Sequence, residues 1–260
     1  MNKWTRKSIE LAQSPSYLDN LFVIYPTIPS DERELDSSNW SLVEKAFAAQ
    51  NHNELISALL NFELFPIKDS YVAYLRQDSH AIQKNPETIK RIGNRVIEMG
   101  LDKVREKCSE PKETNRQIGP MFKNWISSEN LGFPVISNQN DFLDSKDDAI
   151  LNESDDAMKK FAKQYLGYEG DKGLDFIARI NSQYVIGEAK FLTDFGGHQN
   201  AQLAGAMRLF THSNVKANKI AILDRVPYLG NNNQMCIKVR QDPSKDIMSA
   251  LILKEYLSSL

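Results

Sequence analysis

The stretch GLDFIARINSQYVIGEAKF, residues 173–191, decides the fold expected for this chain. It consists of two β-rich runs, residues 173–180 and 183–191, both dominated by β-branched, aromatic and other apolar side chains. Only Asn181-Ser182 separates the two runs, and a two-residue connection is enough for a tight turn between antiparallel strands. The sequence therefore predicts a β-hairpin here.

Two charged side chains interrupt the apolar pattern of the second run. Strand alternation places Glu188 and Lys190 on one face, together with Tyr184 and Ile186. Burying a carboxylate or an ammonium is costly unless a partner compensates for the lost solvation. The pair is therefore expected either to lie on a solvent-facing side of the sheet, or to belong to a site that holds a metal ion and a substrate.

A third charged residue lies in the first run. Asp175 is flanked by Leu174 and Phe176, and the hairpin would bring it close to Glu188. Two neighbouring carboxylates repel each other and shift each other's pKa. A divalent cation relieves the repulsion, and hard oxygen ligands of this kind suit Mg²⁺. Asp175 and Glu188 are thus candidate Mg²⁺ ligands.

Helices and further strands are expected on both sides of the hairpin. Ser154 can cap a helix that ends at Gly167, and Gly196-Gly197 breaks the chain before another helix. The expected elements are helices over 155–166 and 198–212, strands over 219–224 and 235–239, and a final amphipathic helix over 246–257. This order predicts a mixed α/β layer fold rather than a regular Rossmann alternation.

The N-terminal half of the chain is expected to be mostly helical. Segment 41–64 has apolar side chains three and four apart, and Asn85-Pro86 is a typical helix start. The apolar stripe that follows includes Ile89, Ile92 and Val96, and another helix is expected over 117–128. We therefore expect a helical lobe at 1–140, an acidic connecting segment at 141–153 and an α/β core at 154–260.

Composition and charge exclude several classes of protein. The chain has 260 residues, of which 41% are apolar and 25% charged, as in ordinary globular proteins. A net charge of −2 is not that of a protein that coats nucleic acid non-specifically. Cys108 and Cys236 are too few for a disulfide framework or a Cys-rich zinc site. The sequence has neither a long uninterrupted apolar run nor a signal-peptide core, so a cytoplasmic location without membrane contact is expected.

Charge is unevenly distributed along the chain. Residues 84–123 contain ten Lys or Arg and six acids, whereas residues 141–156 contain seven acids and one lysine. The first segment is compatible with a solvated helix face or with a DNA-facing surface. In the second interpretation Arg91, Arg95 and Arg105 would contact DNA phosphates.

The charged residues of the hairpin resemble a known signature. Asp175, twelve intervening residues and then Glu188-Ala189-Lys190, on consecutive strands of a mixed α/β layer, are similar to the pattern of the PD-(D/E)xK nuclease superfamily, whose best-known members are type II restriction endonucleases. The resemblance covers about residues 154–240, and Leu174 stands where the pattern has proline. It implies a restriction-endonuclease-like mixed sheet core flanked by helices, attached here to the mostly helical N-terminal lobe.

The resemblance also implies a role for each of these residues. Asp175 and Glu188 would bind one or two Mg²⁺ ions, with the Ala189 carbonyl as a further ligand, and the metal would activate a water molecule. Lys190 would orient that water or stabilise the transition state. The implied activity is sequence-specific hydrolysis of double-stranded DNA to 5′-phosphate and 3′-hydroxyl ends.

Candidate DNA contacts are expected from residues at helix starts, and partners from the same resemblance. His198, Gln199 and Gln202 open the helix after the hairpin and are expected to cluster on one side of it as phosphate contacts. Arg116-Gln117 could read bases in the major groove. Ordinary helix capping or solvation is the alternative for both sets. The chain would act as a homodimer on a palindromic site, beside a cognate DNA methyltransferase that it does not contact.

Two other functions are compatible with the sequence. A repair, junction-resolving or modification-dependent nuclease would keep the fold and the three charged residues. A DNA-binding protein without catalysis would keep the layer fold alone, but it would have no reason to retain Asp175, Glu188 and Lys190 together.

Overall fold

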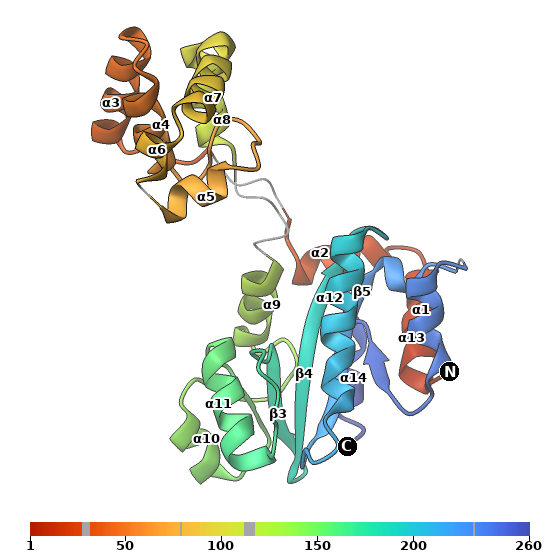
Figure 1. Cartoon of the computed structure of the whole chain (residues 1–260). Coiled ribbons are helices and arrows are strands. Elements are labelled where there is room, and N and C mark those ends of the chain that lie inside the picture. The colour runs from red at the N-terminus through yellow and green to blue at the C-terminus, as the bar shows by residue number, and fades with distance from the viewer. Residues whose placement is uncertain (28–31, 79, 112–117, 231) are drawn as a thin grey trace. The chain divides into compact units, whose positions relative to one another are not determined.

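A mixed β-sheet organises the larger part of the molecule, which we describe from a computed structural model covering residues 1–27, 32–78, 80–111, 118–230 and 232–260. The described strands form one six-stranded sheet in the order β1-β2-β3-β4-β5-β6. They are β1 Val135–Ile136, β2 Ala149–Leu151, β3 Phe176–Ile180, β4 Gln183–Leu192, β5 Asn218–Arg225 and β6 Asp246–Met248. The β2/β3 and β3/β4 pairs are antiparallel and the other three pairs are parallel, which confirms the α/β class with a mixed sheet (Figure 1).

The central hairpin is formed by β3 and β4, as predicted. Ile180 pairs with Gln183, so Asn181 and Ser182 alone make the turn. Both turn residues have positive φ, 47° and 62°, which gives the primed turn geometry that matches the twist of the flanking strands. Asn181 is suited to this conformation because its short polar side chain tolerates the left-handed region.

Helices cover both faces of the sheet. One face carries Val185, Ile220 and Ile222 and packs against α1 Lys3–Ala12, α2 Tyr17–Ile24, α9 Ile118–Ser127 and α14 Leu253–Leu257. The other face carries Ile177 and Ile186 and packs against α10 Gln139–Ser145 and α11 Asp155–Leu166. Farther along that face, α12 Gly197–Met207 and α13 Gln234–Gln241 cover β5 and β6.

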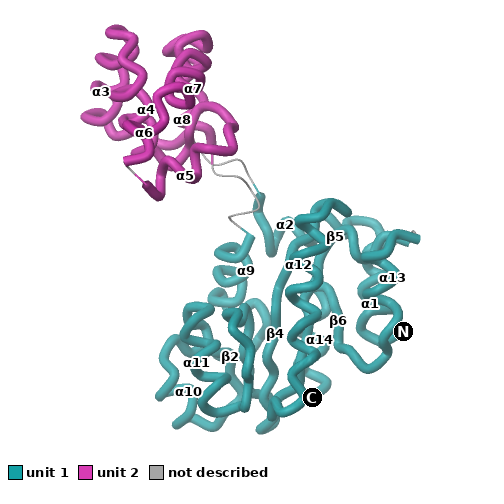
Figure 2. The backbone as a smooth tube through the Cα atoms, viewed as in Figure 1, with its two compact units in different colours: residues 1–27, 114–260 teal, residues 28–113 magenta. Residues whose placement is uncertain are grey.

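The chain divides into two compact units (Figure 2). Residues Met1–Thr27 and Thr114–Leu260 form the unit with the sheet, and Ile28–Glu113 forms the other. These limits differ from the expected division at 1–140, 141–153 and 154–260, because Met1–Thr27 and the segment from Thr114 onward pack with the sheet.

The second unit is helical. Its described helices are α3 Ser37–Ala48, α4 His52–Leu60, α5 Val72–Gln77, α6 Ala81–Lys84, α7 Pro86–Met99 and α8 Leu101–Ser109. The apolar stripe of Ile89, Ile92 and Val96 on α7 is buried in its core, as predicted. Among the described residues of the chain, none of the helices is both long and apolar enough to cross a membrane.

Two predicted elements are wrong. The expected strand over 235–239 is helix α13, because Met235, Cys236 and Val239 form one buried helical face and Asn233 caps the helix start. The expected helix over 246–257 begins instead with the short strand β6, which pairs with β5, and becomes α-helical only at Leu253.

Helix boundaries also differ from prediction. Segment 41–64, expected to be helical, contains most of two helices, α3 and α4, which are separated where Gln50 has a positive φ of 52°. The expected helix over 198–212 ends as α12 at Met207 and continues as a 3-10 turn to Thr211. Strands β1 and β2 and helices α1 and α2 were not predicted.

Close packing at the open end of the hairpin, where Gly187 pairs with Phe176, requires glycine at position 187. A Cβ added to Gly187 would lie 2.9 Å from Ile220 Cγ1 and 3.3 Å from Phe176 Cβ. We expect Gly187→Ala to lower the free energy of unfolding by about 1–3 kcal/mol, because overpacking forces neighbouring side chains to shift. Urea unfolding without divalent cations measures this change.

The matched control for this substitution is Gly119→Ala in α9. A Cβ at Gly119 would meet nothing within 4 Å, so the control should be neutral or slightly stabilising, by up to about 1 kcal/mol. Equal unfolding midpoints for the two variants would contradict the close-packing argument.

Candidate active site

Three charged residues meet at the open end of the hairpin, opposite the turn. Glu188 and Lys190 lie on β4, and Asp175 immediately precedes β3. The Asp175 amide donates a hydrogen bond to the Gly187 carbonyl at 3.1 Å, which extends the strand pairing beyond Phe176. Asp175 therefore lies beside Glu188 on the neighbouring strand.

The ammonium of Lys190 lies at the centre of this group. Its Nζ is 2.6 Å from Asp175 Oδ2 and 2.9 Å from Glu188 Oε2, so both carboxylates reach the same cation. Nζ also donates to the Ala189 carbonyl at 2.9 Å, and the Ala189 amide donates to Asp175 Oδ2 at 2.8 Å. Oxygens from three different residues thus converge on one positive charge.

The group is not an ion pair on a solvent-facing side of the sheet. The Glu188 side chain is 5% exposed, whereas those of Lys190 and Asp175 are 21% and 19% exposed. The site is therefore largely enclosed, with its opening on the side of Asp175 and Lys190.

Burial and charge shift the pKa values at this site. Burial raises the pKa of Glu188 to about 7, Lys190 acts to lower that pKa, and the Asp175 carboxylate raises it further. Burial acts to lower the pKa of Lys190, but the charges of Asp175 and Glu188 outweigh it and raise that pKa. Lys190 is therefore a stable cation, and Glu188 is an acid whose charged form depends on a cation nearby.

The donor set suits a hard divalent cation. The described residues contain no cluster of three or more His, Cys, Asp and Glu side chains able to bind a metal. However, the site provides two carboxylates and one backbone carbonyl, all of them oxygen ligands, and the Lys190 ammonium already occupies the point on which they converge. These residues fit Mg²⁺ with the remaining positions filled by water and substrate.

The polar residues at the start of α12 separate into two groups. His198 is exposed and Gln202 is half-buried, and the two hydrogen-bond to each other, Nε2 to Nε2, at 2.9 Å. Gln199 is 3% exposed and donates to Thr193 Oγ1 at 2.9 Å, while its Oε1 has no partner in the described part of the chain. The expected single cluster is wrong, because Gln199 shares the buried helical face with Leu203 and Ala206.

The arginines expected to face DNA lie in the helical unit, and Arg91 and Arg95 are paired with acids. Arg91 forms an ion pair with Asp69 at 2.6 Å, and Arg95 pairs with Glu98 at 3.4 Å. The Arg105 guanidinium lies 5.4 Å from the centre of the Trp40 ring. Arg116 and Gln117 are outside the described residues.

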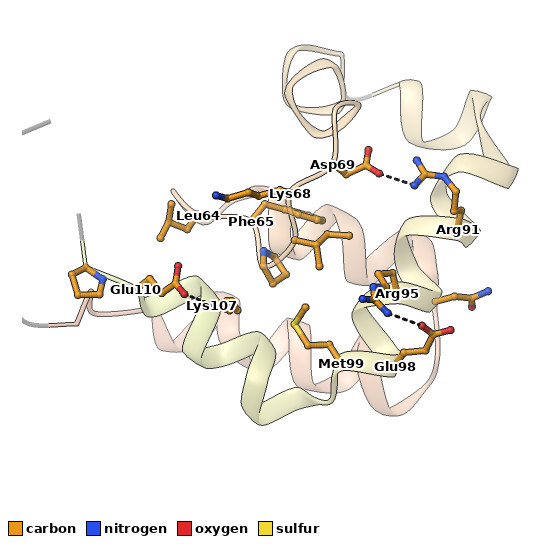
Figure 3. Close-up of a pocket in the computed structure, with 14 residues that line it drawn as sticks. Leu64, Phe65, Lys68, Asp69, Arg91, Arg95, Glu98, Met99, Lys107 and Glu110 are labelled. Carbon is orange, nitrogen blue, oxygen red and sulfur yellow. Dashed lines mark hydrogen bonds and ion pairs between the residues drawn. The ribbon is translucent and has the colours of Figure 1, made fainter. Parts of the chain in front are cut away.

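Arg91 and Arg95 line a surface cavity of about 1130 Å³ in the helical unit, shown in Figure 3. Apolar side chains such as Leu64, Phe65 and Met99 line it together with these charged pairs. Lys107 and Glu110 form another ion pair at its edge. A phosphate that reached these cations would have to compete with carboxylates already in place.

Two charged residues of the sheet unit were not predicted from the sequence. Asp224, at the end of the apolar run KIAILD, is fully buried and accepts hydrogen bonds from Tyr25 and Ser249. Burial raises the pKa of Asp224 to about 6. Lys172 lies just before Asp175, in a glycine-rich loop whose sequence is typical of an ordinary connection.

Comparison with known proteins agrees with this architecture. A model of the family described as Tsp45I type II restriction enzyme matches residues 2–260, which includes both compact units and all three charged residues of the hairpin. No curated protein and no solved structure matches the chain. The match spans nearly the whole length, so the chain belongs to the Tsp45I type II restriction enzyme family and is a site-specific deoxyribonuclease.

Proposed function

We propose that this restriction enzyme hydrolyses both strands of DNA in a Mg²⁺-dependent reaction at Asp175, Glu188 and Lys190, leaving 5′-phosphate and 3′-hydroxyl ends. The observation that carries the proposal is the convergence of Asp175 Oδ2, Glu188 Oε2 and the Ala189 carbonyl on one cationic nitrogen. A group of oxygens that holds an ammonium at 2.6–2.9 Å is arranged to accept a metal cation in its place.

Each residue of the site has its own role in the proposed reaction. Asp175 and Glu188 would hold Mg²⁺ with the Ala189 carbonyl, and the ion would supply an acidified water and neutralise phosphate charge. The Ala189 amide fixes the orientation of the Asp175 carboxylate through the bond to Oδ2. In the metal-free structure both carboxylates raise the pKa of Lys190, so Nζ carries its proton. In the reaction Lys190 would orient the attacking water or stabilise charge on the phosphate.

Assembly follows from the number of sites. Each chain carries one Asp175–Glu188–Lys190 group, which is enough to cut one strand. We infer a homodimer, since two subunits related by a two-fold axis would present two such groups to a palindromic DNA site. A DNA methyltransferase would protect the same site without contacting this chain.

The helical unit is proposed to contact DNA through its arginines. Arg95 and Arg105 are exposed, and their partners, Glu98 and the Trp40 ring, leave them accessible. Arg91 would have to leave Asp69 first. Exposed His198 and half-buried Gln202 on α12 are polar groups on the sheet unit and are proposed as further contacts to the DNA backbone.

Removal of Lys190 tests its role in the reaction. We expect Lys190→Ala to lower the rate of plasmid cleavage by about 10²–10³-fold or more, because a charge contact in the transition state is lost. Folding has to be checked with Mg²⁺ present, since the variant leaves two buried carboxylates without their ammonium.

The control for Lys190 is Lys160→Ala, because Lys160 is an exposed lysine on α11 whose partner is Asp156. This control should cut normally. Cleavage by Lys190→Ala at the rate of the control would remove Lys190 from the mechanism.

Glu188 should make the stability of the protein depend on pH in the absence of metal. Its pKa is raised from 4.5 to about 7, so its stabilising contribution is fully present below pH 4.5 and is lost as the pH rises through 7. Glu188→Gln cannot ionise, and its stability advantage over the natural protein should grow between pH 5 and pH 8. The shift corresponds to a difference on the order of 3 kcal/mol.

Thermal unfolding in EDTA at several pH values measures this difference. Mg²⁺ at pH 8 should raise the Tm of the natural protein but not that of Glu188→Gln. Exposed Glu10 on α1 provides the control, and Glu10→Gln should follow the natural protein under all conditions. A Glu188→Gln variant with the same pH profile and the same response to Mg²⁺ as the natural protein would contradict the metal-ligand assignment.

Charge removal in the helical unit tests its contact with DNA. The double substitution Arg95→Ala with Arg105→Ala should weaken DNA binding and reduce the slope of log K against log salt by about one unit per lost phosphate contact. Exposed Lys45 on α3 is the control, and Lys45→Ala should leave the slope unchanged. If the double variant keeps the natural slope, the basic face of α7 and α8 is only solvated surface.

A further inference from the structure

The loop between α11 and β3, residues 167–175, is packed so closely that its path is fixed. Its sequence GYEGDKGLD has a glycine at every third position. A Cβ at Gly170 would lie 2.1 Å from the Tyr168 hydroxyl oxygen, and one at Gly173 would lie 2.5 Å from Asp155 Cβ. The loop therefore approaches its neighbours more closely than any residue with a side chain would allow.

Hydrogen bonds hold the same loop at several points. The buried Tyr168 side chain donates from its hydroxyl to the Lys172 carbonyl at 3.4 Å. Lys159 on α11 donates to the Asp171 carbonyl at 3.4 Å, and the Leu174 amide donates to the Asp155 carbonyl at 3.2 Å. The backbone on both sides of Lys172 is thus tied to helix α11.

This fixed loop carries the Lys172 side chain across to helix α12. The Lys172 ammonium lies directly over Gly205, where an added Cβ would be 2.6 Å from Nζ. Among the described residues, Lys172 forms no ion pair or side-chain hydrogen bond, and the residue is exposed. It is a cation carried by a fixed backbone, without a contacting carboxylate among the described residues.

Lys172 is also close to the active site. Its charge acts on Glu188 and lowers the pKa of that carboxyl, in the same direction as Lys190. Gly205 lies on α12, which packs along β4 (Figure 1). It is three residues after Gln202 and seven after His198, so the three positions lie along one side of the helix. The Lys172 ammonium therefore lies against α12 at Gly205, one turn from Gln202, and its charge reaches Glu188.

We propose that Lys172 is a substrate-positioning residue whose ammonium binds a non-bridging oxygen of the DNA phosphate beside Asp175 and Glu188, and that position 205 is glycine to leave room for it. This inference rests on the proposed nuclease site. A phosphate that approaches two carboxylates is repelled, and Lys190 is already engaged by both of them. Lys172 is an accessible cation three residues before Asp175, its charge reaches Glu188, and a lysine binds phosphate as a point charge.

The alternative role for Lys172 is purely internal. The ammonium would then only offset the charge of Glu188, and its loss would change the stability of the site without changing contact with DNA. Measurements of DNA binding and its salt dependence distinguish the two roles, because counterion release reports phosphate contacts and not charges that interact only within the protein.

The test uses a double-mutant cycle in the full-length protein. Lys172→Met keeps most of the apolar stem and removes the charge, whereas Gly205→Ala adds a methyl group where the ammonium lies. Gly205→Ala should not unfold the protein, because it displaces only the flexible end of a lysine and alanine favours the helix. Lys160→Met on α11 is the control for removal of a surface lysine.

Plasmid cleavage with Mg²⁺ and DNA binding without divalent cations are measured for each variant. Lys172→Met should cut at least tenfold more slowly and should lose about one unit of salt slope. Gly205→Ala should show smaller losses of cleavage rate and of salt slope. The double variant should cut no more slowly than Lys172→Met alone. Lys160→Met should match the natural protein.

Two results would overturn the proposal. One is an unchanged salt slope for Lys172→Met, which would leave only the internal role. The other is a double variant whose loss of cleavage rate equals the product of the losses in Lys172→Met and Gly205→Ala. Such independent effects would mean that the glycine at 205 is not there to make room for Lys172. If the natural protein failed to cut with Mg²⁺, the proposed nuclease site would be refuted, while the salt slope would still decide whether Lys172 contacts phosphate.

Discussion

The structure of the site depends on one ammonium group that holds two enclosed carboxylates together. Without Lys190, Asp175 and Glu188 would face each other across the hairpin with no cation between them, and their repulsion would oppose the strand pairing that brings them there. A charge buried in this way is tolerated only when every partner is present. The narrow turn at residues 181–182 and the close packing at Gly187 are what keep the three groups in register.

Features that depend on local sequence could be predicted. The hairpin follows from two β-rich runs and a two-residue turn, and helix α11 begins at its Ser154 cap and ends at Gly167 as expected. The proximity of Asp175 to Glu188 follows from the same register, since it requires only that consecutive strands are neighbours. The fold class and the position of the candidate site could therefore be inferred from the hairpin and its flanking helices.

Features that depend on distant partners could not be predicted. Segment 235–239 is apolar enough for a strand, and its Asn233 cap and its burial beside Tyr228 and Ile247 accompany the helix instead. Strand β6 is very short and is defined by its pairing with β5. The N-terminal segment belongs with the sheet because Thr5 donates to the Ile247 carbonyl and the Ser249 amide donates to Ser8, between opposite ends of the chain.

The contrast between Glu188 and Asp224 shows why an acid in an apolar strand does not by itself identify an active site. Both follow apolar runs on adjacent strands, and burial raises the pKa of both. Asp224 accepts hydrogen bonds from the Tyr25 hydroxyl at 2.9 Å, the Ser249 hydroxyl at 2.5 Å and the Ala250 amide at 3.3 Å. Glu188 has, among the described residues, only the Lys190 ammonium as a partner and a second carboxylate beside it. Fixed neutral donors therefore hydrogen-bond to the Asp224 carboxylate, which anchors the N-terminal segment through Tyr25. The fold leaves Glu188 with lone pairs that no neutral donor among the described residues satisfies. This difference in partners, invisible in sequence, separates a structural carboxylate from a proposed metal ligand.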